Sequence, residues 1–212
     1  MLPFSPFCFD CVDCTDTAQL AVELLSILVE NGVEPLPAGF VEHTLPKLAR
    51  LLMSSTEGEV LRPGTQAVKH MLMHDHQQVF AWSDESGRSG LEVCLMIIDR
   101  LLDPTMEDNA ASDVGGLAAE LVEKAGPQRL GPYLAQLLRA VAARLHTAQE
   151  VAIIQSLILV FARLSLTVEG ARDVINFLSE TPIDGQNGLQ IVLSKWLENS
   201  AIFSGYDEIR QK

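Results

Sequence analysis

The chain has 212 residues, of which 48% are hydrophobic and only 6% aromatic, and 28 acidic against 15 basic side chains give it a formal charge of −13 at pH 7. The length suits one large domain or a piece of a larger protein, with an aliphatic core. Because contact with a phosphate backbone requires clustered lysine and arginine, and none are clustered here, nucleic acid is not an expected partner.

Residues 1–14 show no helical period and are predicted to be a loose leader. Cys8, Cys11 and Cys14 within it have the spacing of metal ligands. A tetrahedral zinc site needs a fourth ligand, which is absent nearby. The remaining cysteine, Cys94, lies in an apolar segment and is predicted to be core. We therefore expect no metal here and interpret the cluster as incidental, with a metal site as the alternative.

Helical periodicity begins at about Asp16 and continues through most of the chain. In chain order, the apolar spacing predicts helices over about 18–28, 40–53, 60–72, 91–102, 114–125, 130–145, 154–164, 174–178 and 189–197. Residues 83–90 are predicted to be a loop, and Gly126-Pro127 is predicted to end the helix before it. No useful run alternates with period two, so a sheet is not expected.

An apolar-rich helix recurs along the chain, each time with a second helix before the next copy. The copies are Leu45 to Leu52, Cys94 to Leu102, Leu134 to Val141 and Leu189 to Leu197. Their helices end roughly 45–50 residues apart, as in two-helix solenoid repeats. The predicted fold is therefore all-α, an α-α superhelix of about four antiparallel helix pairs over residues 15–206, with a tail at 207–212. Since one such repeat cannot bury its apolar face alone, the functional unit is the stacked array.

The sequence shows no motif of an enzyme or of a cofactor site. His70 and His74 share a helix face and His76 follows, but the metalloprotease pattern needs a Glu directly after its first His, where Met71 stands. We interpret these histidines as a solvated helix face. Residues 87–90 have the wrong spacing for a nucleophile elbow, and no glycine loop for phosphate occurs.

Membrane insertion is not expected. The most apolar stretch, Val151 to Ala162, is short, contains Gln155 and is bounded by Glu150 and Arg163, so it is predicted to be a buried helix. No basic segment precedes an apolar run at the N-terminus, as a secretory signal would require. These features favour the cytoplasm or nucleus, with reduced thiols.

Several segments resemble a known family. Leu45-Pro46-x-Leu48-x-x-Leu51-Leu52 resembles the first helix of a HEAT repeat, whose early proline bends it. Further segments resemble, in order and spacing, the karyopherin-β (importin-β) family of nuclear import receptors: Leu101 to Pro104, Val114 to Leu117, Lys124 to Gly126, Gln155 to Ala162, Leu193 to Trp196 and Ile202 to Tyr206. The resemblance covers residues 81–206, is weaker over 15–80 and does not extend to 1–14.

The resemblance implies a HEAT-repeat receptor that carries basic protein cargo, notably core histone dimers and ribosomal proteins, under the control of Ran-GTP. Receptors of this family are several times longer than this chain. Their N-terminal repeats do most of the Ran binding, so Ran-GTP would act through a part that is missing here. The alternative function is a HEAT-type scaffold that holds a partner in apolar grooves without preferring basic cargo.

Four acidic residues are the candidate partner-binding residues. Asp113, Glu120 and Glu123 lie off the apolar stripe of their helix and are expected to face solvent, and Glu150 opens a later helix, where a negative charge is favourable. The resemblance places such second helices on the inner, cargo-facing surface of the array. The alternative is a solvated acidic face without a partner.

Overall fold

The computed structural model describes residues 12–166 and 170–203. Its elements, in chain order, are α1 (Val12–Glu30), α2 (Phe40–Ser54), α3 (Gly58–Ala81), α4 (Gly90–Leu101), α5 (Val114–Leu130), α6 (Pro132–Thr147), α7 (Val151–Ser165), α8 (Gly170–Glu180), β1 (Pro182–Ile183), β2 (Gln186–Asn187), α9 (Gly188–Glu198) and α10 (Ser200–Phe203). The two short strands pair in antiparallel fashion and form the only sheet in the described residues. None of the helices in the described residues is long and apolar enough to cross a membrane.

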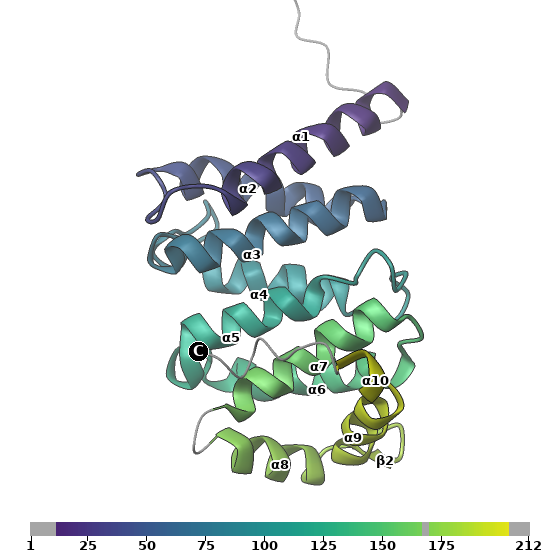
Figure 1. Cartoon of the computed structure of the whole chain (residues 1–212). Helices are drawn as coiled ribbons and strands as arrows, with labels where there is room; N and C mark the ends of the chain where they lie inside the picture. The colour runs from purple at the N-terminus through teal and green to yellow at the C-terminus, as the bar shows by residue number, and fades with distance from the viewer. Residues whose placement is uncertain (1–11, 167–169, 204–212) are drawn as a thin grey trace, which may run out of the picture.

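The helices stack in two layers (Figure 1). In one, α1 packs on α3, α3 on α5 and α5 on α7; we call this the odd layer. In the other, α2 packs on α4, α4 on α6 and α6 on α9; we call this the even layer. The layers are joined within the pairs α2–α3, α4–α5 and α6–α7. The predicted all-α solenoid of helix pairs is therefore confirmed, and the four recurring apolar segments all lie in the even layer.

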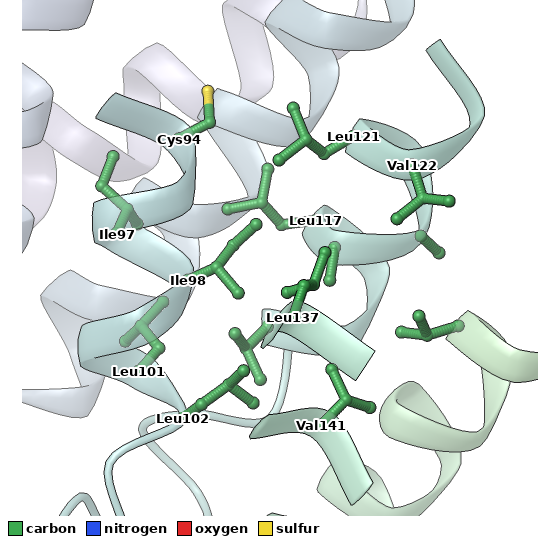
Figure 2. Close-up of a cluster of buried hydrophobic side chains, with 14 of the residues drawn as sticks. Cys94, Ile97, Ile98, Leu101, Leu102, Leu117, Leu121, Val122, Leu137 and Val141 are labelled. Atoms are coloured by element: carbon green, nitrogen blue, oxygen red, sulfur yellow. The ribbon is translucent and has the colours of Figure 1, made fainter. Parts of the chain in front are cut away.

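The core lies between the layers. Figure 2 shows side chains of α4, α5 and α6 pointing toward one another, among them Ile98, Leu117 and Leu137. Cys94 is fully buried in this core, as predicted, and burial raises the pKa of its thiol to about 12. Burying such aliphatic side chains contributes about 1.5–3 kcal/mol each.

Three helix boundaries differ from the prediction. α1 begins at Val12, so Cys14 belongs to a helix rather than to the leader; Cys8 and Cys11 lie outside the described residues, as does the predicted tail at 207–212. Gly126 does break α5, with φ 68°, but helical turns resume and continue to Leu130. α3 extends past the predicted 60–72 to Ala81, across an interruption at Asp75.

Basic side chains join successive helices of the even layer at their ends. Arg100 of α4 donates hydrogen bonds to the carbonyl oxygens of Leu52 and Ser55, at 3.0 and 2.7 Å, where α2 ends. Lys195 of α9 donates to the carbonyl oxygen of Ala148, at 2.7 Å, where α6 ends. The last carbonyls of a helix have no partner within it, so a cation from the next repeat satisfies them and opposes the negative helix end.

Candidate partner-binding surface

Asp113 lies directly before α5 and faces α3. Its carboxylate accepts a hydrogen bond from Gln66 and forms an ion pair with Arg62, at 3.5 Å. The side chain is 22% exposed, so it is half-buried rather than free in solvent as expected. Asp113 therefore links α5 to α3, and any partner would share it with Arg62.

Glu120 does not face solvent, and this prediction was wrong. The residue is only 6% exposed, and its carboxylate pairs with Lys124, one turn further along α5, at 3.5 Å. The stripe pattern assumed that a single face of α5 is covered, whereas α5 packs against α3, α4, α6 and α7. A helix with neighbours on several sides leaves only a narrow strip for solvent, and Glu120 lies outside it.

Glu123 is exposed, as predicted, but it is not free. Its carboxylate forms an ion pair with Arg163 of α7. Both side chains are largely accessible, at 47% and 40%, so the pair contributes at most about 1 kcal/mol. Like Asp113, Glu123 connects neighbouring helices of the odd layer.

Glu150 is exposed at the position that precedes α7, as predicted. Within the described residues its carboxylate makes no hydrogen bond or ion pair, and it does not cap the helix through its side chain. It is the one candidate acid whose charge is not matched by a base of the described chain.

The start of α7 is capped instead by Asp108, a residue that no motif in the sequence marks. The backbone N–H groups of Gln149 and Glu150 donate to its carboxylate at 2.6 and 2.8 Å, and Arg144 pairs with it at 2.7 Å. Burial by itself raises the pKa of Asp108, but the two N–H donors and the Arg144 charge outweigh it, so the pKa lies below its usual range. No local pattern reveals this cap, because Asp108 is some 40 residues from the helix it caps.

The predicted histidine face is also partly wrong. His70 is buried, its Nδ1 has no hydrogen-bond partner in the described structure, and its ring lies 6.4 Å from that of His74. His74 contacts Glu34 at 2.7 Å through Nδ1, and its side chain is 11% exposed. α1 packs on α3 and covers this region, which helical periodicity within α3 alone could not reveal. The described residues hold no group of three His, Cys, Asp or Glu side chains placed to bind a metal.

Three of the four candidate acids therefore already have a basic partner within the chain. Asp113, Glu120 and Glu123 each have a basic partner, from α3, α5 and α7 respectively. This surface can recognise positive charge through Glu150 and through the carboxylates of Asp113 and Glu123, which are already paired with bases of the chain. None of the four acids is paired with a nucleophile.

Comparison with known proteins finds similarity to three importins, although no protein-family model matches. The chain is 30% identical over 193 residues to importin subunit beta-5 of Schizosaccharomyces pombe. It is 27% identical over 190 residues to importin-9 of Drosophila melanogaster, and 27% identical over 194 residues to importin subunit beta-5 of Saccharomyces cerevisiae. These alignments cover 88–91% of this chain but only 18–19% of each relative.

The alignments span almost the whole described solenoid, so the likeness belongs to the helical array and not to a short motif. They also agree with the karyopherin-β resemblance of the sequence segments. The chain is therefore homologous to a part, about a fifth in length, of the karyopherin-family proteins importin subunit beta-5 and importin-9.

Proposed function

We propose that the chain acts as a segment of a nuclear import receptor that binds basic protein cargo. The observation that carries the proposal is the homology with importins over about 90% of the chain. The formal charge of −13 supports a basic protein as the partner rather than a nucleic acid. Core histone dimers and ribosomal proteins are the cargo classes, and Ran-GTP acts through parts of the receptor beyond this segment. Such a receptor works in the cytoplasm and the nucleus and has no enzymatic step.

Within this proposal, Glu150, Glu123 and Asp113 are the cargo-contacting acids of the odd layer. Glu150 is exposed and unpaired in the described structure, so it can pair with a cargo Lys or Arg directly. Glu123 and Asp113 contribute by exchanging an internal base for one from the cargo. Glu120 is excluded from direct contact because it is buried beside Lys124.

The direct test is binding of a purified core histone dimer to the chain across a range of salt concentrations. Charge-driven binding weakens with ionic strength because the screening length falls to about 10 Å at 0.1 M salt. A scaffold that holds its partner in apolar grooves, the alternative function, would bind with little salt dependence and would not distinguish a basic from an acidic protein.

The Glu123–Arg163 pair allows a matched comparison. Glu123→Gln and Arg163→Met break the same ion pair, but only the first removes the acid. If Glu123 contacts cargo, Glu123→Gln weakens histone binding, whereas Arg163→Met leaves it equal or stronger. Equal affinities for both variants, each with an unchanged melting temperature, would remove Glu123 from the cargo surface.

Glu150→Gln tests an acid that has no basic partner within the described residues, so the substitution breaks no ion pair of the chain there. Because each exposed charge contributes about 1 kcal/mol or less, the expected weakening is up to about fivefold, with a smaller salt dependence. Histone binding with unchanged affinity and unchanged salt dependence in Glu150→Gln would contradict its role.

A further inference from the structure

The even layer carries two neighbouring hollows that share part of their lining. The larger, of about 780 Å³, lies between α2 and α4, and its lining includes Pro46, Met53, Trp82 and Ile97. The smaller, of about 310 Å³, lies between α4 and α6, and its lining includes Leu95, Leu102, Tyr133 and Leu137. Met96 and Arg88 line both hollows. We call the joined surface the even-layer groove.

The floor of the even-layer groove is apolar and accessible. Met96, in the middle, is half-buried, and Met53 and Tyr133 near its two ends are 38% and 41% exposed. Methionine adapts its shape to different partners and is frequent at surfaces that bind varied peptides. Apolar side chains that stay accessible in a groove favour a partner that buries them.

The charges around the groove are predominantly acidic. Five acidic and two basic residues line it. Arg88 is neutralised by Asp84, at 2.7 Å, and Glu92 accepts from the backbone N–H of Ser89, at 2.8 Å. The lining charges without an ion pair or hydrogen bond in the described structure are three exposed acids, Glu42, Glu85 and Asp99, and one base, Arg50.

We propose that the even-layer groove binds a peptide segment in polyproline II conformation, in which every third residue is apolar and the residues between are lysine or arginine. The apolar side chains would occupy the two hollows on either side of Met96, and the basic ones would pair with Glu42, Glu85 and Asp99. Neighbouring packed helices are about 8–10 Å apart. A chain in polyproline II conformation has three residues per turn and advances about 3.1 Å per residue, so apolar residues three positions apart lie on one face, about 9 Å apart, and match the two hollows. The basic character of the peptide rests on the proposed function. The peptide site, however, lies on the even layer, opposite to Glu123 and Glu150 in the odd layer.

The probe is a fluorescent peptide of repeated Leu-Lys-Lys units, measured by anisotropy against the full chain. The controls are the same peptide with Lys replaced by Ser, and with Leu replaced by Ser. Binding of the Leu-Lys peptide, at least about tenfold tighter than either control, is the expected result. Equal binding of the neutral Leu-Ser peptide would overturn the proposal, because the acids would then play no part.

Two variants locate the peptide. Met96→Lys places a cation in the floor and should weaken binding at least about tenfold, since it opposes the basic residues and buries a charge against apolar side chains. Met73→Lys, on α3 at an exposed methionine outside the groove lining, is the control and should bind as wild type. The double variant Glu85→Gln, Asp99→Asn should keep its fold and lose most of the salt dependence. Wild-type affinity in Met96→Lys would overturn the proposal.

The histone dimer distinguishes this proposal from the proposed function. If the peptide binds in the groove but the histone dimer does not bind the chain, the result contradicts the proposed function and supports the even-layer groove as a peptide site. If the histone dimer binds, and Glu150→Gln weakens its binding whereas Met96→Lys does not, the proposed function is supported and the even-layer groove is overturned as a site for basic cargo.

Discussion

The guanidinium of Arg100 in α4 reaches back 48 residues along the chain and donates to the carbonyl oxygen of Leu52 at 3.0 Å. Arg100 thereby ties the end of one even-layer helix to the next, as Lys195 ties the end of α6 to α9. In a stacked array each repeat contacts only its neighbours, so these hydrogen bonds add to the apolar packing that joins successive repeats.

Arg100→Met should destabilise the chain by about 1.5–3 kcal/mol, because it keeps the length of the side chain but removes charge-assisted hydrogen bonds from part-buried carbonyls. Urea unfolding monitored by circular dichroism measures this. Arg50→Met provides the control: Arg50 is the basic residue at the same place in the preceding copy, is exposed and has no partner in the described residues. A loss in Arg50→Met as large as that in Arg100→Met would show that the α2 contacts are not the cause.

Two adjacent glycines in α5 should respond in opposite directions to alanine. A Cβ at Gly115 would lie 2.0 Å from the carbonyl oxygen of Ser156 in α7, so the backbones of α5 and α7 touch there. A Cβ at Gly116 would lie 3.6 Å from its nearest neighbour, the Cδ of the flexible Lys69 side chain. We expect Gly115→Ala to cost about 1–3 kcal/mol by forcing the helices apart, and Gly116→Ala to stabilise the helix by about 0.5–1 kcal/mol.

Thermal melting of the two glycine variants measures the difference. The prediction is contradicted if Gly115→Ala melts at or above the wild-type temperature, because α5 and α7 would then have to pack less closely than described.

The stability of the chain should fall as pH drops from 7 toward 5.5, in part because of His70. Burial lowers the pKa of His70, and Lys69 and His74 lower it further, while Glu30 opposes them. A lowered folded-state pKa means that the unfolded chain binds a proton first, at about pH 6.5, so acidification through that range favours unfolding. The effect levels off once the pH is below the folded-state pKa.

His70→Gln should reduce this pH dependence, whereas His43→Gln, at an exposed position on α2, should leave it unchanged. The measurement is the urea midpoint at pH 7.5, 6.5 and 5.5. A slope in His70→Gln equal to that of the wild type would assign the pH dependence to other groups.

The chain should associate with itself in solution through α1. Leu20, Leu24, Ile27 and Leu28 on this helix are 57–65% exposed, an apolar face that no described element covers. Contiguous exposed apolar surface of this kind promotes association. Sedimentation of the wild type against a Leu20→Lys, Leu24→Glu double variant tests this, since the two charges cancel and the net charge stays the same.

The matched control for α1 is Val151→Glu, in the first turn of α7, where an exposed apolar residue is replaced but the α1 face remains. We expect the α1 variant to shift toward monomer and the control to behave as wild type. A wild-type chain that sediments as a monomer at about 10–100 μM, where exposed apolar surface usually associates, would contradict the prediction.

The sequence alone predicted most of the helices, their order and their assembly into repeats, but not the full lengths of α1 and α3, nor the short β1–β2 sheet. Apolar spacing predicted the helix over 114–125, and Gly126 breaks α5 as expected. Leu52, Leu102 and Leu145 recur near the ends of the apolar helices, are all buried, and lie in or directly after helices of the even layer. These features depend on helix geometry and on the spacing of apolar and polar residues, both of which can be read from neighbouring positions in the sequence. The karyopherin resemblance came from the same segments and agrees with the importin relatives.

Only the tertiary structure decided which polar residues are available to a partner. The apolar period of their own helices predicts that Glu120 and His70 face solvent, yet neighbouring helices bury both. Glu123 is exposed, but its carboxylate forms an ion pair with Arg163, 40 residues away. Likewise Met96 becomes the centre of a groove only because α2, α4 and α6 are stacked side by side. Periodicity predicts which face of one helix is apolar and which is polar. Exposure and charge pairing depend on the other helices that pack against it, and these come from distant parts of the chain.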